Sequence, residues 1–246
     1  MAGISINTLL WALVGGIIPT FLWLWFWFNQ TKRPEHTGTI SIMYILGMVC
    51  VFIVIPLNNI IEHSQLPQSQ YLLAFAAVEE ITKVLVTILI AFRRESIQHP
   101  EDYTMYLVTT ALGFSGIENT LYLIQPIVQH NIGYVLMAGN LRFIGSTLLH
   151  TVCVAIVGIM VGIVHDEGWF IKLAHIIIGL GLAISLHGAF NYFIMVNTTR
   201  SIIIGLSGLW FVGMIVVVMF GRIQKLQQFR RETINVLSAN PLPTNV

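Results

Sequence analysis

The sequence predicts an all-α bundle of membrane-spanning helices. Of its 246 residues, 56% are hydrophobic and only 9% are charged, whereas a soluble domain carries roughly 25% charged residues. So little charge cannot cover the surface of a soluble fold, and so hydrophobic a composition excludes an intrinsically disordered chain. The apolar residues also form long continuous runs, which are typical of transmembrane helices and too long for the strands of a membrane barrel.

Seven stretches have the roughly 20 mostly apolar residues that a spanning helix needs. We expect one membrane-embedded domain over residues 1–221, followed by a basic cytoplasmic tail over 222–246 that begins as a partly amphipathic helix and ends disordered. The predicted spans lie near Ser5–Phe28, Ile40–Ile61, Gln70–Phe92, Tyr103–Gln125, Asn140–Val164, Trp169–Val196 and Ser201–Gly221.

The first predicted span has the features of a membrane anchor. It ends in the aromatic run Trp23–Phe28, which Lys32 and Arg33 follow, and aromatic and basic side chains mark the membrane interface. The stretch has no basic segment before it, is too long for the apolar part of a signal peptide, and is not followed by a small-residue cleavage site. We therefore expect it to remain as a helix of the bundle.

Basic residues are distributed unequally between the two ends of the predicted spans. One side holds only Arg142 and Arg200, while Lys83 falls within a span. The positive-inside rule therefore predicts that the N-terminus lies outside and the C-terminus in the cytoplasm. The nine basic residues of the cytoplasmic side are Lys32, Arg33, Arg93, Arg94, Lys172, Arg222, Lys225, Arg230 and Arg231.

Charge and cysteine content exclude several other classes of function. The formal net charge is +1, which gives no field for binding nucleic acid. The two cysteines, Cys50 and Cys153, lie within apolar runs. This excludes a disulfide framework and a zinc cluster built from thiolates.

Ionisable side chains within the spans are the candidates for function, because burying them in a membrane is costly. Glu79, Glu118, His150 and His187 come from four different spans and lie seven to ten residues from the expected outer helix ends. At 1.5 Å per residue, all four are roughly 10–15 Å below those ends. The sequence thus predicts that two carboxylates and two imidazoles meet in one layer.

Helical spacing adds detail to this layer. Glu79 and Lys83 are four residues apart, so they share a helix face and can pair. Glu80 is turned about 100° from Glu79, so one glutamate can face a cavity while a neighbouring helix holds the other. His187 and Asn191 are also four residues apart and share a face.

These residue types suit the attack of water on an amide. A carboxylate beside a second carboxylate and a lysine can act as a base near neutral pH, and a histidine and an asparagine can donate hydrogen bonds to an oxyanion. The same groups also suit a divalent metal, with Glu118, His150 and His187 as ligands and another glutamate as base. The chemistry thus remains open between bound Zn²⁺ and no cofactor.

Four segments, in this order, resemble the motifs of PrsW-type intramembrane proteases. Glu79–Lys83 is similar to their Glu-Glu-x-x-Lys motif, and Gly113–Tyr122 to Gly-Phe-x-x-x-Glu-Asn-x-x-Tyr. His150–Gly162 resembles their histidine helix with its trailing glycines, and His187–Asn191 their final histidine motif. The resemblance covers about residues 70–195.

The resemblance implies a multi-pass protease in the plasma membrane of a prokaryote. It also implies kinship with the CAAX prenyl endopeptidases and with the non-catalytic scaffold subunit of gamma-secretase. Essential roles are implied for Glu79, Glu80 and the motif histidines. PrsW-type members are described as metalloproteases, whereas the CAAX relatives use a glutamate-activated water without metal, so both chemistries stay open.

Our hypothesis is an intramembrane endopeptidase that hydrolyses a peptide bond in a membrane-anchored protein. Glu79 or Glu80 is the candidate base for water, and Lys83 tunes the pair. The expected partners are membrane lipid and the anchored substrate; neither the substrate's identity nor the oligomeric state follows from the sequence. The remaining assignments are Glu118 and His150 for holding the water or a metal, and His187 with Asn191 for stabilising the oxyanion.

Two other classes of function use similar residues. Chains of glutamate, lysine and histidine also conduct protons, so a proton-coupled transporter or channel is one alternative. Such proteins typically show inverted repeats or broken helices, which the sequence does not display clearly. A non-catalytic membrane scaffold is the other alternative, and the glutamate pair argues against it.

Overall fold

The computed structural model describes residues 5–31, 37–91 and 97–239, of which 227 and 230–239 are described as backbone only. This part of the chain is helical and contains no strand. In chain order its helices are α1 (Ile6–Gln30), α2 (Thr37–Glu62), α3 (Gln68–Ile90), α4 (Pro100–Val128), α5 (Ile132–Leu141), a π-helical turn η1 (Arg142–Ser146), α6 (Thr147–Ile163), α7 (Trp169–Met195) and α8 (Thr199–Ala239).

The predicted all-α membrane fold is confirmed. Among the described residues, five helical segments are long and apolar enough to cross a membrane, and their outer surfaces expose many large hydrophobic side chains. Helices α3 and α4 are not among the five, and they are the helices that carry the buried glutamates. The five segments are Ile6–Gln30, Thr37–Glu62, Ile132–Ile163, Trp169–Met195 and Thr199–Leu226.

The count of seven spans and the orientation remain predictions. The orientation depends partly on Lys32, Arg33, Arg93 and Arg94, which lie outside the described residues. The final residues of the tail, 240–246, where we expect disorder, also lie outside them.

Several helices are longer than the apolar runs that predict them. Helix α4 continues to Val128, and α5 already begins at Ile132, so the turn between them is short. From Ile132 the chain stays helical through η1 into α6, eight residues before the expected start of that span at Asn140. Helix α8 continues to Ala239 because no proline interrupts it before Pro241.

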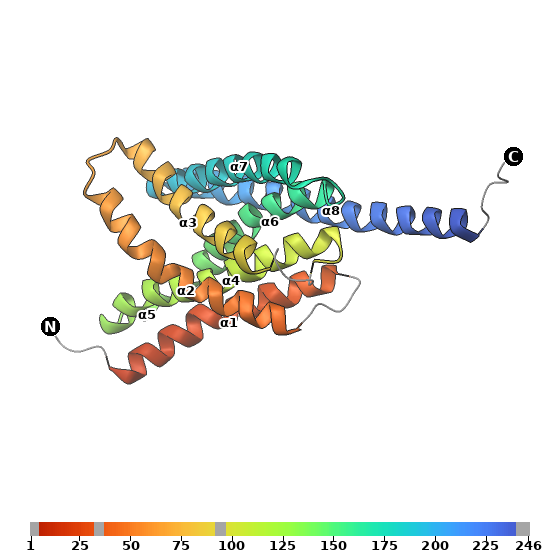
Figure 1. Cartoon of the computed structure of the whole chain (residues 1–246). Coiled ribbons are helices and arrows are strands. Elements are labelled where there is room, and N and C mark those ends of the chain that lie inside the picture. The colour runs from red at the N-terminus through yellow and green to blue at the C-terminus, as the bar shows by residue number, and fades with distance from the viewer. Residues whose placement is uncertain (1–4, 32–36, 92–96, 240–246) are drawn as a thin grey trace, which may run out of the picture.

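Helix α4 is the centre of the bundle (Figure 1). Helices α1, α2 and α6 pack against it, and every residue from Pro100 to Gly116 is buried. A helix that is covered on all sides can carry polar groups that no lipid-facing helix tolerates. The central position of α4 therefore explains how Glu118 and Asn119 are accommodated in its C-terminal half.

Glycines allow α2 and α6 to pack so closely against α4 that their backbones are in contact. A Cβ atom at Gly113 would collide with the carbonyl of Tyr44 on α2, and one at Gly47 would collide with the carbonyl of Thr110 on α4. Gly158 likewise brings α6 into backbone contact with Thr104. Small residues at such crossings are how membrane helices gain packing contacts, because lipid provides no hydrophobic force between them.

We expect Gly113→Ala to destabilise the fold, because the added methyl group has to displace a backbone carbonyl. Overpacking of this kind costs about 1–3 kcal/mol. Thermal unfolding of the protein in detergent measures the loss. Gly208→Ala on α8 is the matched control, since a Cβ there meets no atom within 4 Å. Equal unfolding temperatures for the two variants would contradict the proposed close packing.

Candidate active site

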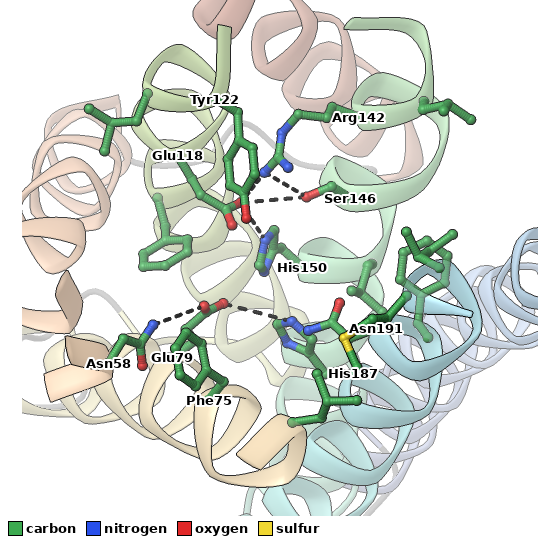
Figure 2. Close-up of a pocket in the computed structure, with 18 of the residues that line it drawn as sticks. Asn58, Phe75, Glu79, Glu118, Tyr122, Arg142, Ser146, His150, His187 and Asn191 are labelled. Atoms are coloured by element: carbon green, nitrogen blue, oxygen red, sulfur yellow. Dashed lines mark hydrogen bonds and ion pairs between the residues drawn. The ribbon is translucent and has the colours of Figure 1, made fainter. Parts of the chain in front are cut away.

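Four helices bring the predicted polar side chains together in the interior of the bundle. Glu79, from α3, lies beside His187, from α7, and Glu118, from α4, lies beside His150, from α6 (Figure 2). The two histidine rings are 5.1 Å apart between centroids. The predicted meeting of two carboxylates and two imidazoles is confirmed, and the four side chains come from four separate helices.

Glu80 is the most tightly held group of this cluster. Lys83 Nζ donates to Glu80 Oε1 at 2.6 Å, and His187 Nδ1 donates to the same oxygen at 2.7 Å. The side chains of Glu80 and Lys83 are both fully buried. A buried carboxylate needs such partners, because an unpaired charge away from water is very costly.

The lysine pairs with Glu80 and not with Glu79, which corrects the pairing expected from the sequence. Residues three apart and four apart both face each other on a helix, so spacing alone does not decide between them. Packing decides here: Lys83 Nζ lies 5.0 Å from the ring centre of Phe114 and 2.9 Å from His150 Nδ1. Both contacts keep it on the side of Glu80.

Glu79 instead faces the cavity. Asn58 Nδ2 is 3.5 Å from its Oε1, and His187 Nε2 is 3.7 Å from its Oε2 (Figure 2). Its Oε2 is buried and has no hydrogen-bond partner. The expectation that one glutamate faces a cavity while other helices hold the second is therefore confirmed, with Glu79 as the cavity residue.

The hydrogen bonds assign the tautomers of the two histidines. An ammonium group can only donate, so His150 Nδ1 accepts from Lys83, and His150 Nε2–H donates to Glu118 Oε2 at 2.9 Å. A carboxylate can only accept, so His187 Nδ1–H donates to Glu80. In the neutral ring, the lone pair of His187 Nε2 is then left to face Glu79 and the cavity.

Arg142 is a member of the site that the sequence analysis did not include. We counted it only as a basic residue at an outer helix end, yet its Nη2 lies 2.7 Å from Glu118 Oε2. Its Nε donates to Asn119 Oδ1 at 2.6 Å, and its guanidinium stacks 3.8 Å from the ring centre of Tyr122. The Glu-Asn-x-x-Tyr motif was the signal for it, since a carboxylate, an amide and an aromatic ring on one helix face together suit a guanidinium.

A cavity of about 710 Å³ opens beside these groups. Glu79, Glu118, His150 and His187 line it, and so does Asn191, one turn after His187 (Figure 2). Glu80 and Lys83 lie behind this wall and do not line it. Most of the remaining lining is apolar, and it comes from α2 to α8.

The donor set fits a catalytic divalent metal. Ligand atoms of Glu79, His150 and His187 lie within 4.8 Å of one another, and all three residues are buried. Two histidines and a glutamate are a known ligand set of catalytic zinc. The sequence suggested Glu118 as the carboxylate of this set, but the structure offers Glu79, because Arg142 and His150 already engage Glu118. A metal on His150 would replace its hydrogen bond to Lys83 or to Glu118, since both ring nitrogens are engaged.

The charges at the site also favour a cation. Within the described residues, three carboxylates meet two cations here, Lys83 and Arg142. A second group, Glu80, Cys153 and His187, also has ligand atoms within 4.8 Å of one another. That group is less suitable, because Glu80 is already bound by Lys83.

Comparison with known proteins shows what kind of site this is. Over residues 9–221 the chain matches the family described as PrsW family intramembrane metalloprotease. The chain belongs to this family. It is therefore a peptidase that acts within a membrane, as the motifs and the buried glutamates and histidines indicate, and the resemblance noted in the sequence is confirmed.

Several bacterial proteins named Protease PrsW are similar to this chain. The one from Oceanobacillus iheyensis is 26% identical over 183 residues, which cover 73% of this chain and 81% of the relative. The one from Shouchella clausii is 26% identical over 156 residues, covering 61% and 67%. The one from Bacillus subtilis is 22% identical over 185 residues, covering 72% and 79%. No solved structure matches the chain.

We expect Lys83→Met to destabilise this PrsW-family protein strongly, because it leaves the buried Glu80 carboxylate without its cation. Breaking a buried ion pair in this way costs about 3–5 kcal/mol. Thermal unfolding in detergent measures the effect, with the exposed Lys225→Met as control. The double variant Glu80→Gln/Lys83→Met should regain part of the loss, and a single variant as stable as the control would contradict the role of this pair.

Proposed function

We propose that Glu79, His150 and His187 form the hydrolytic centre, and that this centre cleaves a peptide bond in a membrane-anchored protein at the plasma membrane. The single observation that carries the proposal is the environment of Glu79. Its buried Oε2 has no hydrogen-bond partner and lies 3.7 Å from His187 Nε2, and both residues line the cavity. A water placed there has an acceptor for its proton and sits beside an imidazole nitrogen.

The two glutamates have different tasks in this proposal. Glu79 Oε2 takes the proton from the attacking water, because Glu79 lines the cavity and this oxygen has no hydrogen-bond partner. Glu80 holds the ring of His187 through Nδ1–H, which keeps the Nε2 lone pair pointed at the cavity. Lys83 keeps Glu80 in place and also binds His150.

A divalent metal ion fits the same residues. Glu79, His150 and His187 would hold it, and such an ion polarises a carbonyl group and lowers the pKa of bound water. Glu79 would then be a ligand, and Glu118 would be the remaining carboxylate on the cavity wall to take up the proton. The family description as a metalloprotease favours this route.

The walls of the cavity suit a segment of a membrane protein. Tyr134, Met137 and Leu141 contribute apolar lining from α5, and no residue of α5 is buried. The cavity is thus bordered by a helix with little packing to hold it against the bundle. An apolar peptide segment that approaches from the lipid can meet the polar centre at this border.

We expect Glu79→Gln to lower turnover of a reconstituted substrate at least about 100-fold, because loss of a positioned acid–base group costs 10²–10⁴-fold. Glu62→Gln is the matched control, since Glu62 is exposed at the end of α2. Undiminished turnover in Glu79→Gln would contradict the proposed centre.

Metal content separates the two chemistries. If a metal is held as the geometry suggests, the purified protein contains about one equivalent of zinc, and a chelator abolishes turnover until zinc is restored. Glu79→Gln and His187→Ala should then lose the metal, whereas Glu118→Gln should keep it. A protein that is fully active after chelation and free of metal would leave glutamate-activated water as the mechanism.

We expect Asn191→Ala to lower kcat about 100-fold with little change in KM, because Asn191 lines the cavity beside His187 and is placed to donate to the oxyanion. Steady-state kinetics with the reconstituted substrate measures both constants. The exposed Asn59→Ala is the control. A rise in KM at unchanged kcat would instead assign Asn191 to substrate binding.

A further inference from the structure

We propose that Arg142 is a positioning residue of the hydrolytic site, which acts by fixing Glu118 against His150. The inference rests on the proposed hydrolytic centre and extends it to the π-helical turn η1. Neither the sequence motifs nor the family comparison assigns a task to Arg142.

The guanidinium of Arg142 is held on three sides by one face of α4. Glu118 accepts from Nη2 at 2.7 Å, Asn119 Oδ1 accepts from Nε at 2.6 Å, and Tyr122 lies beneath the guanidinium plane at 3.8 Å. These contacts use the planar, forked shape of arginine, which a lysine ammonium does not have. A cation held this firmly fixes the position of the carboxylate that it binds.

Glu118 connects Arg142 to the other residues of the site. The oxygen that binds Arg142 is also the one that accepts from His150 Nε2 at 2.9 Å. The other ring nitrogen of His150 accepts from Lys83, which in turn binds Glu80. The chain of contacts from Arg142 to the glutamate pair is therefore continuous, and each link is 2.6–2.9 Å long.

The π-helical turn places Arg142 where it can do this. Thr147 N–H donates to the carbonyl of Arg142, five residues back, so one extra residue is accommodated in the turn. Arg142, Ser146 and His150 are spaced by four residues, and all three have polar atoms within 3.5 Å of Glu118 Oε2. Single π-turns in long helices are frequently found at functional sites.

A positioning role differs from a role in folding or in binding substrate. The Arg142 and Glu118 side chains are 16% and 19% exposed, so their ion pair lies at the cavity wall and is not fully buried. Removing Arg142 therefore leaves no deeply buried charge unpaired. We expect the packing of the other helices around α4 to be unchanged. What changes is the orientation of Glu118 and, through it, of the His150 ring.

The test compares Arg142→Gln, Arg142→Lys and Glu118→Gln with the double variant Arg142→Gln/Glu118→Gln, using full-length protein in liposomes with a cleavable membrane-anchored reporter. Arg200→Gln is the matched control, because Arg200 is the other basic residue on the predicted outer side and is exposed. For each variant, kcat, KM and the unfolding temperature are measured.

We expect Arg142→Gln to lower kcat about 10–100-fold, the usual cost of losing a residue that orients a site residue from outside. KM should stay within about twofold of its original value, since on the proposed mechanism Arg142 does not bind the substrate. Arg142→Lys should restore only part of kcat. In the Glu118→Gln background, removing Arg142 should have little further effect, because Arg142 acts through Glu118.

Three results would overturn the proposal. The first is that Arg142→Gln matches the Arg200→Gln control in kcat. The second is a rise in KM at unchanged kcat, which would make Arg142 a substrate-binding residue. The third is the loss of folded protein in all Arg142 variants, including Arg142→Lys and the double variant, which would make it a residue of the scaffold only.

Glu79→Gln, measured in the same reporter assay, separates this inference from the proposed function. If Glu79→Gln is inactive and Arg142→Gln matches its control, only the role of Arg142 is wrong. If Glu79→Gln keeps full turnover, the hydrolytic centre itself is wrong, whatever Arg142 does.

Discussion

The buried carboxylate of Glu80 is the constraint on which the rest of the site depends. It is fully buried in the interior of a membrane bundle, where an ionised group needs a cation and hydrogen bonds to remain. Lys83 provides the cation, and His187 donates the second hydrogen bond. Because these partners come from two helices, their contacts with Glu80 Oε1 also fix α3 against α7 and orient the imidazole that faces the cavity.

The two adjacent glutamates therefore have different tasks. Glu80 orients a histidine, and Glu79 faces the cavity in which we propose that hydrolysis takes place. Glu80 is bound at Oε1 by Lys83 and His187 and does not line the cavity, while Glu79, turned about 100° around the same helix, does line it. A group that binds water or a metal must reach the cavity, and a group that orients a histidine must be fixed by other side chains. Adjacent positions on one helix meet both needs with a single rigid element.

Helix α4 contributes another part of the cavity wall, and its Glu118 is also held by side chains of a neighbouring helix. Its glycine contacts with α2 and its covering by α1 and α6 keep it buried over most of its length, and in its C-terminal half Glu118 lines the cavity while Asn119 is buried. There Glu118 connects two groups from the long helix 132–163, Arg142 and His150. The polar network therefore crosses the bundle from α3 to η1 without leaving the protein interior.

The sequence by itself determined the membrane class, the all-α fold and the layer in which Glu79, Glu118, His150 and His187 meet, because apolar run length and residue depth depend only on helix geometry. It could not decide which glutamate Lys83 binds, since residues three and four apart share a helix face and only the packing of Phe114 and His150 selects one. It also could not place Arg142, whose approach to Glu118 depends on a π-helical turn and on contacts between helices far apart in the chain. Side-chain partners across helices were decided by the tertiary structure alone, because they depend on helix rotation and separation, which local spacing does not contain.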